Sequence, residues 1–256
     1  MRDSIINKIF KQKKLENVFF IIGVILILLL WLISSNLIDN EIVIPKINDV
    51  ARRTYEYLTD WYTIKIVLFT IVKLIVIVTI CAILAYLLAV LAYLSNSFRY
   101  ILKPFMSLIR TLPIVTVIIL LLLYVGFKAT PIYICAFVVL PIIYEQVLVS
   151  FDGIDKNIIE ETKMLSNTNF KVIVNVYLPL SMPYFISSIF TVLGLGLKVL
   201  VMAEIFSLGN NTIGEQIQIA RSLADTVGIF AWTLILLIIV FIFESVIRII
   251  MKKRAI

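Results

Sequence analysis

Residues 74–94 read LIVIVTICAILAYLLAVLAYL and contain no charged side chain. A helix of about 20 apolar residues crosses a membrane, and this run is continuous rather than alternating, so it predicts a transmembrane helix and excludes a transmembrane barrel strand. The whole chain agrees, because 62% of its 256 residues are hydrophobic and 15% are charged. In soluble domains about 45 to 50% of the residues are hydrophobic and about 25% are charged. We therefore expect an integral membrane protein.

Five further stretches approach the same length and apolarity: 18–33, 112–127, 131–149, 184–203 and 227–247. The first follows four lysines, but no A-x-A-like cleavage site comes after it, so we expect it to be retained as a helix. The remainder is too short for a separate soluble domain. The sequence predicts an all-α polytopic membrane protein with about six transmembrane helices, in which residues 1–256 form a single domain.

The composition also limits the chemistry. The chain has no histidine and two cysteines, which excludes a histidine-ligated metal, a histidine base and a zinc site. Cys81 and Cys135 lie in apolar runs, where a cysteine is usually a small buried hydrophobe. We expect no cofactor or metal to be bound by this chain, and no enzymatic activity.

Basic residues predict the orientation. Lysine and arginine gather in the amino-terminal tail, in the 95–110 connection and at the carboxyl end, and the positive-inside rule places these regions in the cytoplasm together with the 150–175 loop. The net charge of +7 is then a topology signal, and we expect no nucleic-acid partner. Residues 38–62 would lie outside as an amphipathic helix, which either anchors at the lipid headgroups or contacts an external partner.

The longest cytoplasmic connection runs from residue 152 to 179. Asp155 is a good helix N-cap, and a short amphipathic helix is expected to follow it. Its apolar face would carry Ile154, Ile158, Ile159, Thr162 and Leu165, and its polar face Asp155, Lys156, Glu160, Glu161 and Lys163. Ser166 and Asn167 can end this helix, and a second helical stretch over 169–178 would end at Pro179. Periodicity alone leaves open whether the apolar face lies on the membrane or docks to a partner.

Residues 160–179, EETKMLSNTNFKVIVNVYLP, resemble the EAA motif of permease subunits of ATP-binding-cassette importers. Glu160 matches the motif glutamate, Leu165 the residue before its glycine, and Leu178 with Pro179 its end. Glu161 and Thr162 replace the two alanines, and Ser166 replaces the glycine.

A second segment resembles one particular branch of this permease family. Residues 110–126, RTLPIVTVIILLLLYVG, are similar to a segment of the nitrate, sulfonate and taurine branch of these permeases. Ala203 and Glu204 match an Ala-Glu pair near the end of the fifth span in that branch. The matched segments occur in the family's order.

The resemblance implies a type I importer permease fold in a bacterial cell (inner) membrane, with both termini cytoplasmic. It implies a second permease copy, in a homodimer, an extracytoplasmic substrate-binding protein, and partner ATPase subunits that bind ATP and Mg. The chain lacks a G-x-x-x-x-G-K-[ST] phosphate loop, so ATP hydrolysis would belong to the partner. The implied solute is small and anionic. The implied ATPase-coupling residues are Asp155, Ile158, Ile159, Glu160, Glu161, Thr162, Leu165, Ser166 and Asn167.

Charges inside the spans are the remaining candidates, because each is costly in lipid. Lys198 follows the small residues Gly194 and Gly196, which let another helix approach. Lys198 either lines the substrate pathway and favours an anion or pairs with Glu244 or snorkels. Glu204 lies about 120° around the helix from Lys198, so the two should not pair within it. We count Lys198, Glu204, Gly194 and Gly196 as candidate pathway residues.

Three other span charges have simpler interpretations. Lys65 and Lys73 would snorkel to the headgroups at the outer end of the second span. Glu145 would cap its helix or pair with a basic loop residue.

Three other functions fit the same spans. A secondary transporter or channel would work without an ATPase, and a membrane enzyme would need paired acids in facing spans, where the sequence has no aspartate. A passive scaffold would leave Lys198 unexplained.

Overall fold

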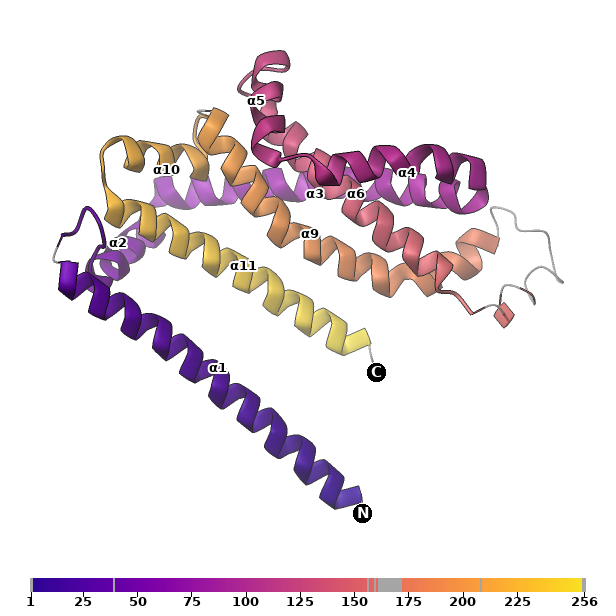
Figure 1. Ribbon diagram of the computed structural model, residues 1–256, viewed down its shortest axis with the longest axis horizontal. Helices are drawn as coiled ribbons and strands as arrows, with labels where there is room; N and C mark the ends of the chain where they lie inside the picture. Colours follow the sequence, from indigo (N-terminus) through magenta and orange to yellow (C-terminus); the bar gives the residue numbers. More distant parts are fainter. Residues whose placement is uncertain are drawn as a thin grey trace.

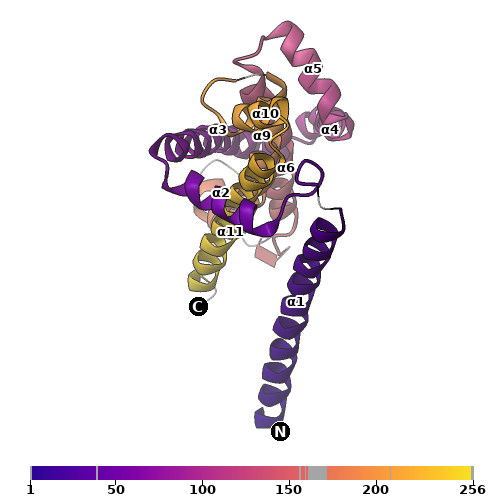
Figure 2. The same cartoon turned by 90° about the vertical axis from the view of Figure 1, so that its left-hand side faces the viewer.

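The computed structural model describes residues 2–38, 40–155, 157, 158, 160, 172–207 and 209–254. Every regular element within these ranges is a helix, so the predicted all-α class is confirmed. Figure 1 shows that α1 (Arg2–Ile38) begins, and α11 (Thr226–Arg254) ends, away from α2 (Ile47–Thr59) and α10 (Ile213–Ser222). Both views show the amino-terminal part of α1 diverging from the other helices (Figures 1 and 2), whereas near its end the ring of Trp31 lies 5.4 Å from that of Phe230 on α11.

Five described helices are long and apolar enough to cross a membrane. Their spanning parts are Val18–Ile38 in α1, Trp61–Leu94 (α3), Thr130–Asp152 (α6), Val174–Ser207 and Thr226–Val246 in α11. A bent helix pair would raise the number to six. The prediction of about six spans is therefore confirmed, and the chain is a multi-pass membrane protein.

The predicted third span over residues 112–127 is wrong as a single straight helix. The 95–110 connection is itself helical, as α4 (Asn96–Thr111), and α5 (Ile114–Tyr124) follows at a bend of 100°. Leu112 is extended, with φ −69° and ψ 136°, because the ring of Pro113 disfavours a helical conformation in the residue before it. The 11 residues of α5 reach only about 17 Å, too short to cross a hydrocarbon core of about 30 Å.

The sequence predicted that a helix ends at Pro179, and this prediction is wrong. Helix α9 (Leu178–Ser207) runs through Pro179 and Pro183, directly after the π-helix η1 (Ile173–Tyr177). We attribute the continuation to the wider π turn, which changes the hydrogen-bond register just where proline lacks an N–H. One continuous rod therefore joins the carboxyl end of the 152–179 connection to the other end of the bundle.

Helix α9 packs against α3 and α6 to form the core. A Cβ built on Gly196 would lie 3.1 Å from Leu74 and 3.3 Å from Val139, so three helices meet closely at this glycine. Cys81 and Cys135 are free and buried in the same core, as the sequence predicted.

Helix α2 is the predicted amphipathic helix of the 38–62 segment, and it packs across the start of α11 (Figure 2). The rings of Tyr57 and Trp232 lie 5.0 Å apart, and Arg53 Nη1 lies 2.9 Å from Asp225 Oδ2. Tyr55 remains exposed on the other side of the helix. Helix α2 thus turns one face to the bundle and leaves only the other for lipid or a partner.

Candidate functional site

The loop that resembles the EAA motif leaves directly from the end of α6. This helix ends at Asp152, and Asp155 Oδ1 then accepts a hydrogen bond of 2.9 Å from the backbone N–H of Asn157. Ile158 packs against the core, whereas Glu160 is exposed. The side chain of Asp155 is thus placed as the predicted N-cap, and the described residues Ile158 and Glu160 lie on the apolar and the polar side that the sequence predicted for them. The remaining coupling candidates lie outside the described residues: Ile159, Glu161, Thr162, Leu165, Ser166 and Asn167.

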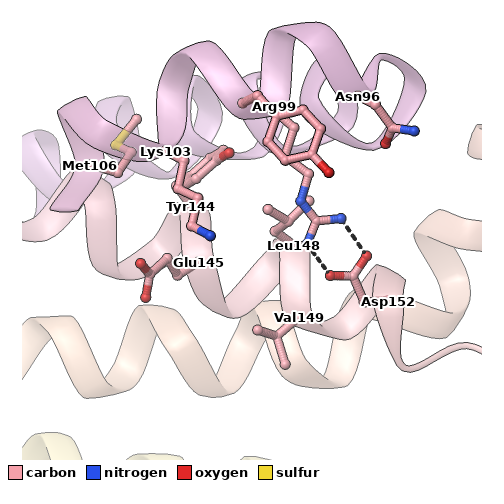
Figure 3. A pocket seen from close by; sticks show the side chains of 10 residues that line it. Asn96, Arg99, Lys103, Met106, Tyr144, Glu145, Leu148, Val149 and Asp152 are labelled. Carbon is pink, nitrogen blue, oxygen red and sulfur yellow. Dashed lines mark hydrogen bonds and ion pairs between the residues drawn. The ribbon is translucent and has the colours of Figure 1, made fainter.

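Two ion pairs tie α4 to the end of α6. The guanidinium of Arg99 grips Asp152 with both its terminal nitrogens, with Nη1 lying 3.0 Å from Oδ1 (Figure 3). Arg110, near the end of α4, pairs with Glu145, which lies seven residues before Asp152 on α6. Between them lies a cavity of about 390 Å³ that Lys103 and Tyr144 also line. Motion at Asp152, three residues before Asp155, would therefore reach α4 and then α5.

A buried ion pair crosses the bundle nearer its other end. Lys73 Nζ on α3 lies 3.0 Å from Glu204 Oε1 on α9, and the Glu204 side chain has no exposed surface. The second carboxylate oxygen of Glu204 accepts a hydrogen bond of 3.4 Å from the backbone N–H of Gly214. The prediction that Lys73 snorkels to the headgroups is thus wrong, because a carboxylate within the protein neutralises it.

Lys65 lies on α3 about two turns before Lys73. Its ammonium group lies 5.5 Å from the centre of the Trp61 ring, a cation–π contact. Its side chain is exposed near the start of α3, and snorkelling to the headgroups stays a prediction.

Lys198 lies in a different place from Glu204. Together with Gly194 and Glu244, Lys198 lines a groove of about 390 Å³ between α9 and α11. Both charged side chains are exposed there. The two interpretations of Lys198, pathway contact or partner of Glu244, therefore remain predictions.

A cavity beside the buried pair was not predicted. This hollow, which we call the outer cavity, has a volume of about 620 Å³ and lies between α3, the start of α6 and the segment after α9. Its polar lining consists of Lys73, Lys128, Ser207, Asn210 and Thr212. No spacing in the sequence could bring these three segments together. Among the residues that the structure describes, no group of three or more histidine, cysteine or acidic side chains could hold a metal.

The fold and these sites define a multi-pass membrane protein in which several charged side chains pair between helices. Residues 81–255 match the sequence model of the binding-protein-dependent transport system inner membrane component, and the chain belongs to this family. A comparison with curated proteins finds no match. The family is a membrane permease component of transporters, so the predicted transport role is confirmed at this level. The match begins within α3, and α1 and α2 precede it.

Proposed function

We propose that this chain is the pathway-forming permease of an ATP-driven importer. A second copy of the chain would complete the pathway, an extracytoplasmic binding protein would deliver the solute, and partner ATPase subunits would bind ATP and Mg. The basic tail, α4 and the 150–180 loop would face the cytoplasm of a bacterial cell, with α2 and α10 outside. The proposal extends the family membership, which by itself identifies neither the solute nor the energy source.

The observation that carries the proposal is the position of the capped segment at residues 155–160. It follows α6 directly, and its neighbour Ile154 and its own Ile158 pack against the core that α6 and α9 share, the two helices with the most extensive packing in the bundle. A force on this segment would therefore act on α6 and α9 together. Because packed helices move as rigid bodies, closure of an ATPase pair could then be converted into alternating access.

The surface of α5 supports a second copy. Leu123 and Tyr124 are 76% and 84% exposed on a helix too short to span the membrane by itself. In a membrane, α5 would be one half of a broken span, and contact with another copy would cover its exposed side chains.

We propose a small anion as the solute, of the nitrate, sulfonate or taurine kind. The resemblance of residues 110–126 supports this class, and so does the largely buried Lys73. Lys198 and its neighbour Gly194 remain candidate pathway residues, as do Gly196 and Glu204. An uptake assay on Lys198→Met separates the two interpretations: an unchanged KM assigns Lys198 to its groove with Glu244, and a raised KM assigns it to the pathway.

The coupling claim is tested in proteoliposomes that contain the chain, its ATPase and its binding protein. Glu160→Gln combined with Ile158→Pro should abolish substrate-stimulated ATP hydrolysis, because the segment that receives the push is broken. Glu41→Gln, an exposed acidic position at the other end of the molecule, is the matched control. If the double variant keeps full stimulation, the loop does not couple the two subunits.

A further inference from the structure

The outer cavity has a polar side and an apolar side. Lys73 and Lys128 lie on the polar side, and Phe69, Phe127 and Pro131 contribute the apolar side. A volume of about 620 Å³ is ample for a small organic solute. The cavity therefore suits a molecule that has one polar end and one short apolar end.

The charges of the cavity favour a negative ligand. Within the part of the chain that the structure describes, its lining holds two lysines and no acidic residue. A second hollow of about 410 Å³ shares Phe69 and Asn210 with the outer cavity and adds Lys65 and Asn211. The lysines would repel a cation, and a purely apolar molecule could not accept a hydrogen bond from either ammonium group.

Lys73 is the residue that connects the cavity with the interior. Its ammonium contacts Glu204 at 3.0 Å, yet 17% of its side chain is exposed and lines the cavity. An ammonium has three N–H donors, and Glu204 uses one of them. The same group can therefore donate to a ligand from one side while Glu204 holds it from the other.

Glu204 is fixed in turn by the backbone. It is fully buried, and its second oxygen faces the N–H of Gly214 at the start of α10. A ligand that draws Lys73 toward the cavity would weaken the only ion pair of Glu204 that the described residues form. Because an unpaired buried carboxylate is costly, ligand binding and the position of α9 would be linked.

We propose that the outer cavity binds a small anion through Lys73 and Lys128, and that Lys73 is shared between this anion and Glu204. Binding requires only the cavity. Its use in transport rests on the proposed function, since the cavity must then open to the translocation pathway.

The test measures binding apart from transport. The purified full-length chain in nanodiscs is titrated with methanesulfonate, which replaces gluconate at constant ionic strength, and the midpoint of thermal unfolding is followed. Dimethyl sulfone, of similar shape but without charge, is the matched ligand control. We expect saturable stabilisation by methanesulfonate and none by dimethyl sulfone.

The variants separate Lys73 from a general effect of salt. Lys73→Met with Glu204→Gln removes both buried charges and so keeps the variant folded, and it should weaken binding about tenfold or more, the equivalent of one charged hydrogen bond. Glu204→Gln alone should tighten binding, because it frees Lys73 from its competitor. Lys103→Met, which lies on α4 outside the cavity, should bind as the wild type does.

Equal binding by the double variant and the wild type would overturn the inference, and so would loss of binding in Lys198→Met instead. Stabilisation by dimethyl sulfone to the same extent would also overturn it. If binding follows the expected pattern but ATP-driven uptake is absent, the anion site stands and the importer function fails. If ATP-driven uptake is present but binding does not depend on Lys73, the importer function stands and the anion site fails.

Discussion

Gly214 lies against Glu204 so closely that a Cβ at position 214 would be 2.3 Å from the Cβ of Glu204. Two backbone atoms, Ile205 N and Val201 O, would each lie 2.7 Å from it. Backbone in a packed helix cannot move aside as a flexible side chain can. The start of α10 is therefore seated on the end of α9, directly over the buried ion pair.

Gly214→Ala should destabilise the chain by about 1 to 3 kcal/mol, because overpacking forces the backbone to shift. The measurement is the midpoint of thermal unfolding in detergent. Gly209→Ala is the matched control, since the nearest atom to a Cβ there lies at an ordinary 3.5 Å. Equal midpoints for the two variants would show that α10 is not seated as described.

The pair of Lys73 and Glu204 predicts a non-additive result. Lys73→Met alone leaves a buried carboxylate unpaired and should cost about 3 to 5 kcal/mol. Adding Glu204→Gln should restore most of this loss, because the remaining amide can still accept the N–H of Gly214. A double-mutant cycle on unfolding free energies checks the prediction, and strict additivity would contradict it.

Asp60 predicts a dependence of stability on pH. Its carboxylate accepts hydrogen bonds of 2.9 Å from the backbone N–H and the hydroxyl of Thr63, at the start of α3. The backbone hydrogen bond, followed by the hydroxyl bond, lowers the pKa of Asp60 from its ordinary value. A lowered folded pKa contributes stability above the unfolded value of about 3.9, and this is lost as the pH falls through the folded pKa.

Asp60→Ala should therefore lower the unfolding midpoint at pH 7 and flatten its decline on acidification below about pH 4. Asp60→Asn supplies the control, because asparagine also caps helices but carries no titrating charge. This variant should keep most of the midpoint at pH 7 while losing the acid dependence. If Asp60→Ala declines with acid as steeply as the wild type, the cap does not contribute.

Arg99 predicts an effect on coupling rather than on stability. Its pair with Asp152 is more than a third exposed on both sides, and such pairs contribute about 0 to 1 kcal/mol. Arg99→Gln should therefore leave the unfolding midpoint nearly unchanged. It should lower the amount of solute transported per ATP hydrolysed, because α4 is released from the end of α6.

Arg52→Gln is the matched control for Arg99, since it breaks an exposed pair with Glu56 on α2, away from the loop. An equal transport ratio for Arg99→Gln, Arg52→Gln and the wild type would remove α4 from the coupling route.

The spans were predictable because lipid requires a long apolar run, and 74–94 and 131–149 lie inside α3 and α6. The helix ends were less predictable. The bend of the third span falls at Pro113, whereas Pro179 directly follows a π-helix and leaves α9 unbroken. The cap at Asp155 was local, so the sequence alone predicted it correctly.

The contacts between distant segments could not be predicted from one sequence. Lys73 and Glu204 are 131 positions apart, and Arg99 and Asp152 are 53 apart. Neither pair shares a helix, so periodicity could not join them. Lys73 was assigned to the headgroups for this reason, although a lysine 12 positions into a 34-residue helix could equally have indicated a buried partner.

The energy source tests the central claim most directly. Proteoliposomes that contain the chain, its ATPase and its binding protein are loaded with ATP on the ATPase side, and the uptake of radiolabelled methanesulfonate or taurine is followed without any ion gradient. We predict accumulation against the solute gradient that stops when ATP or the binding protein is omitted. Accumulation driven by an ion gradient in liposomes that contain this chain alone would contradict the account and identify a secondary transporter.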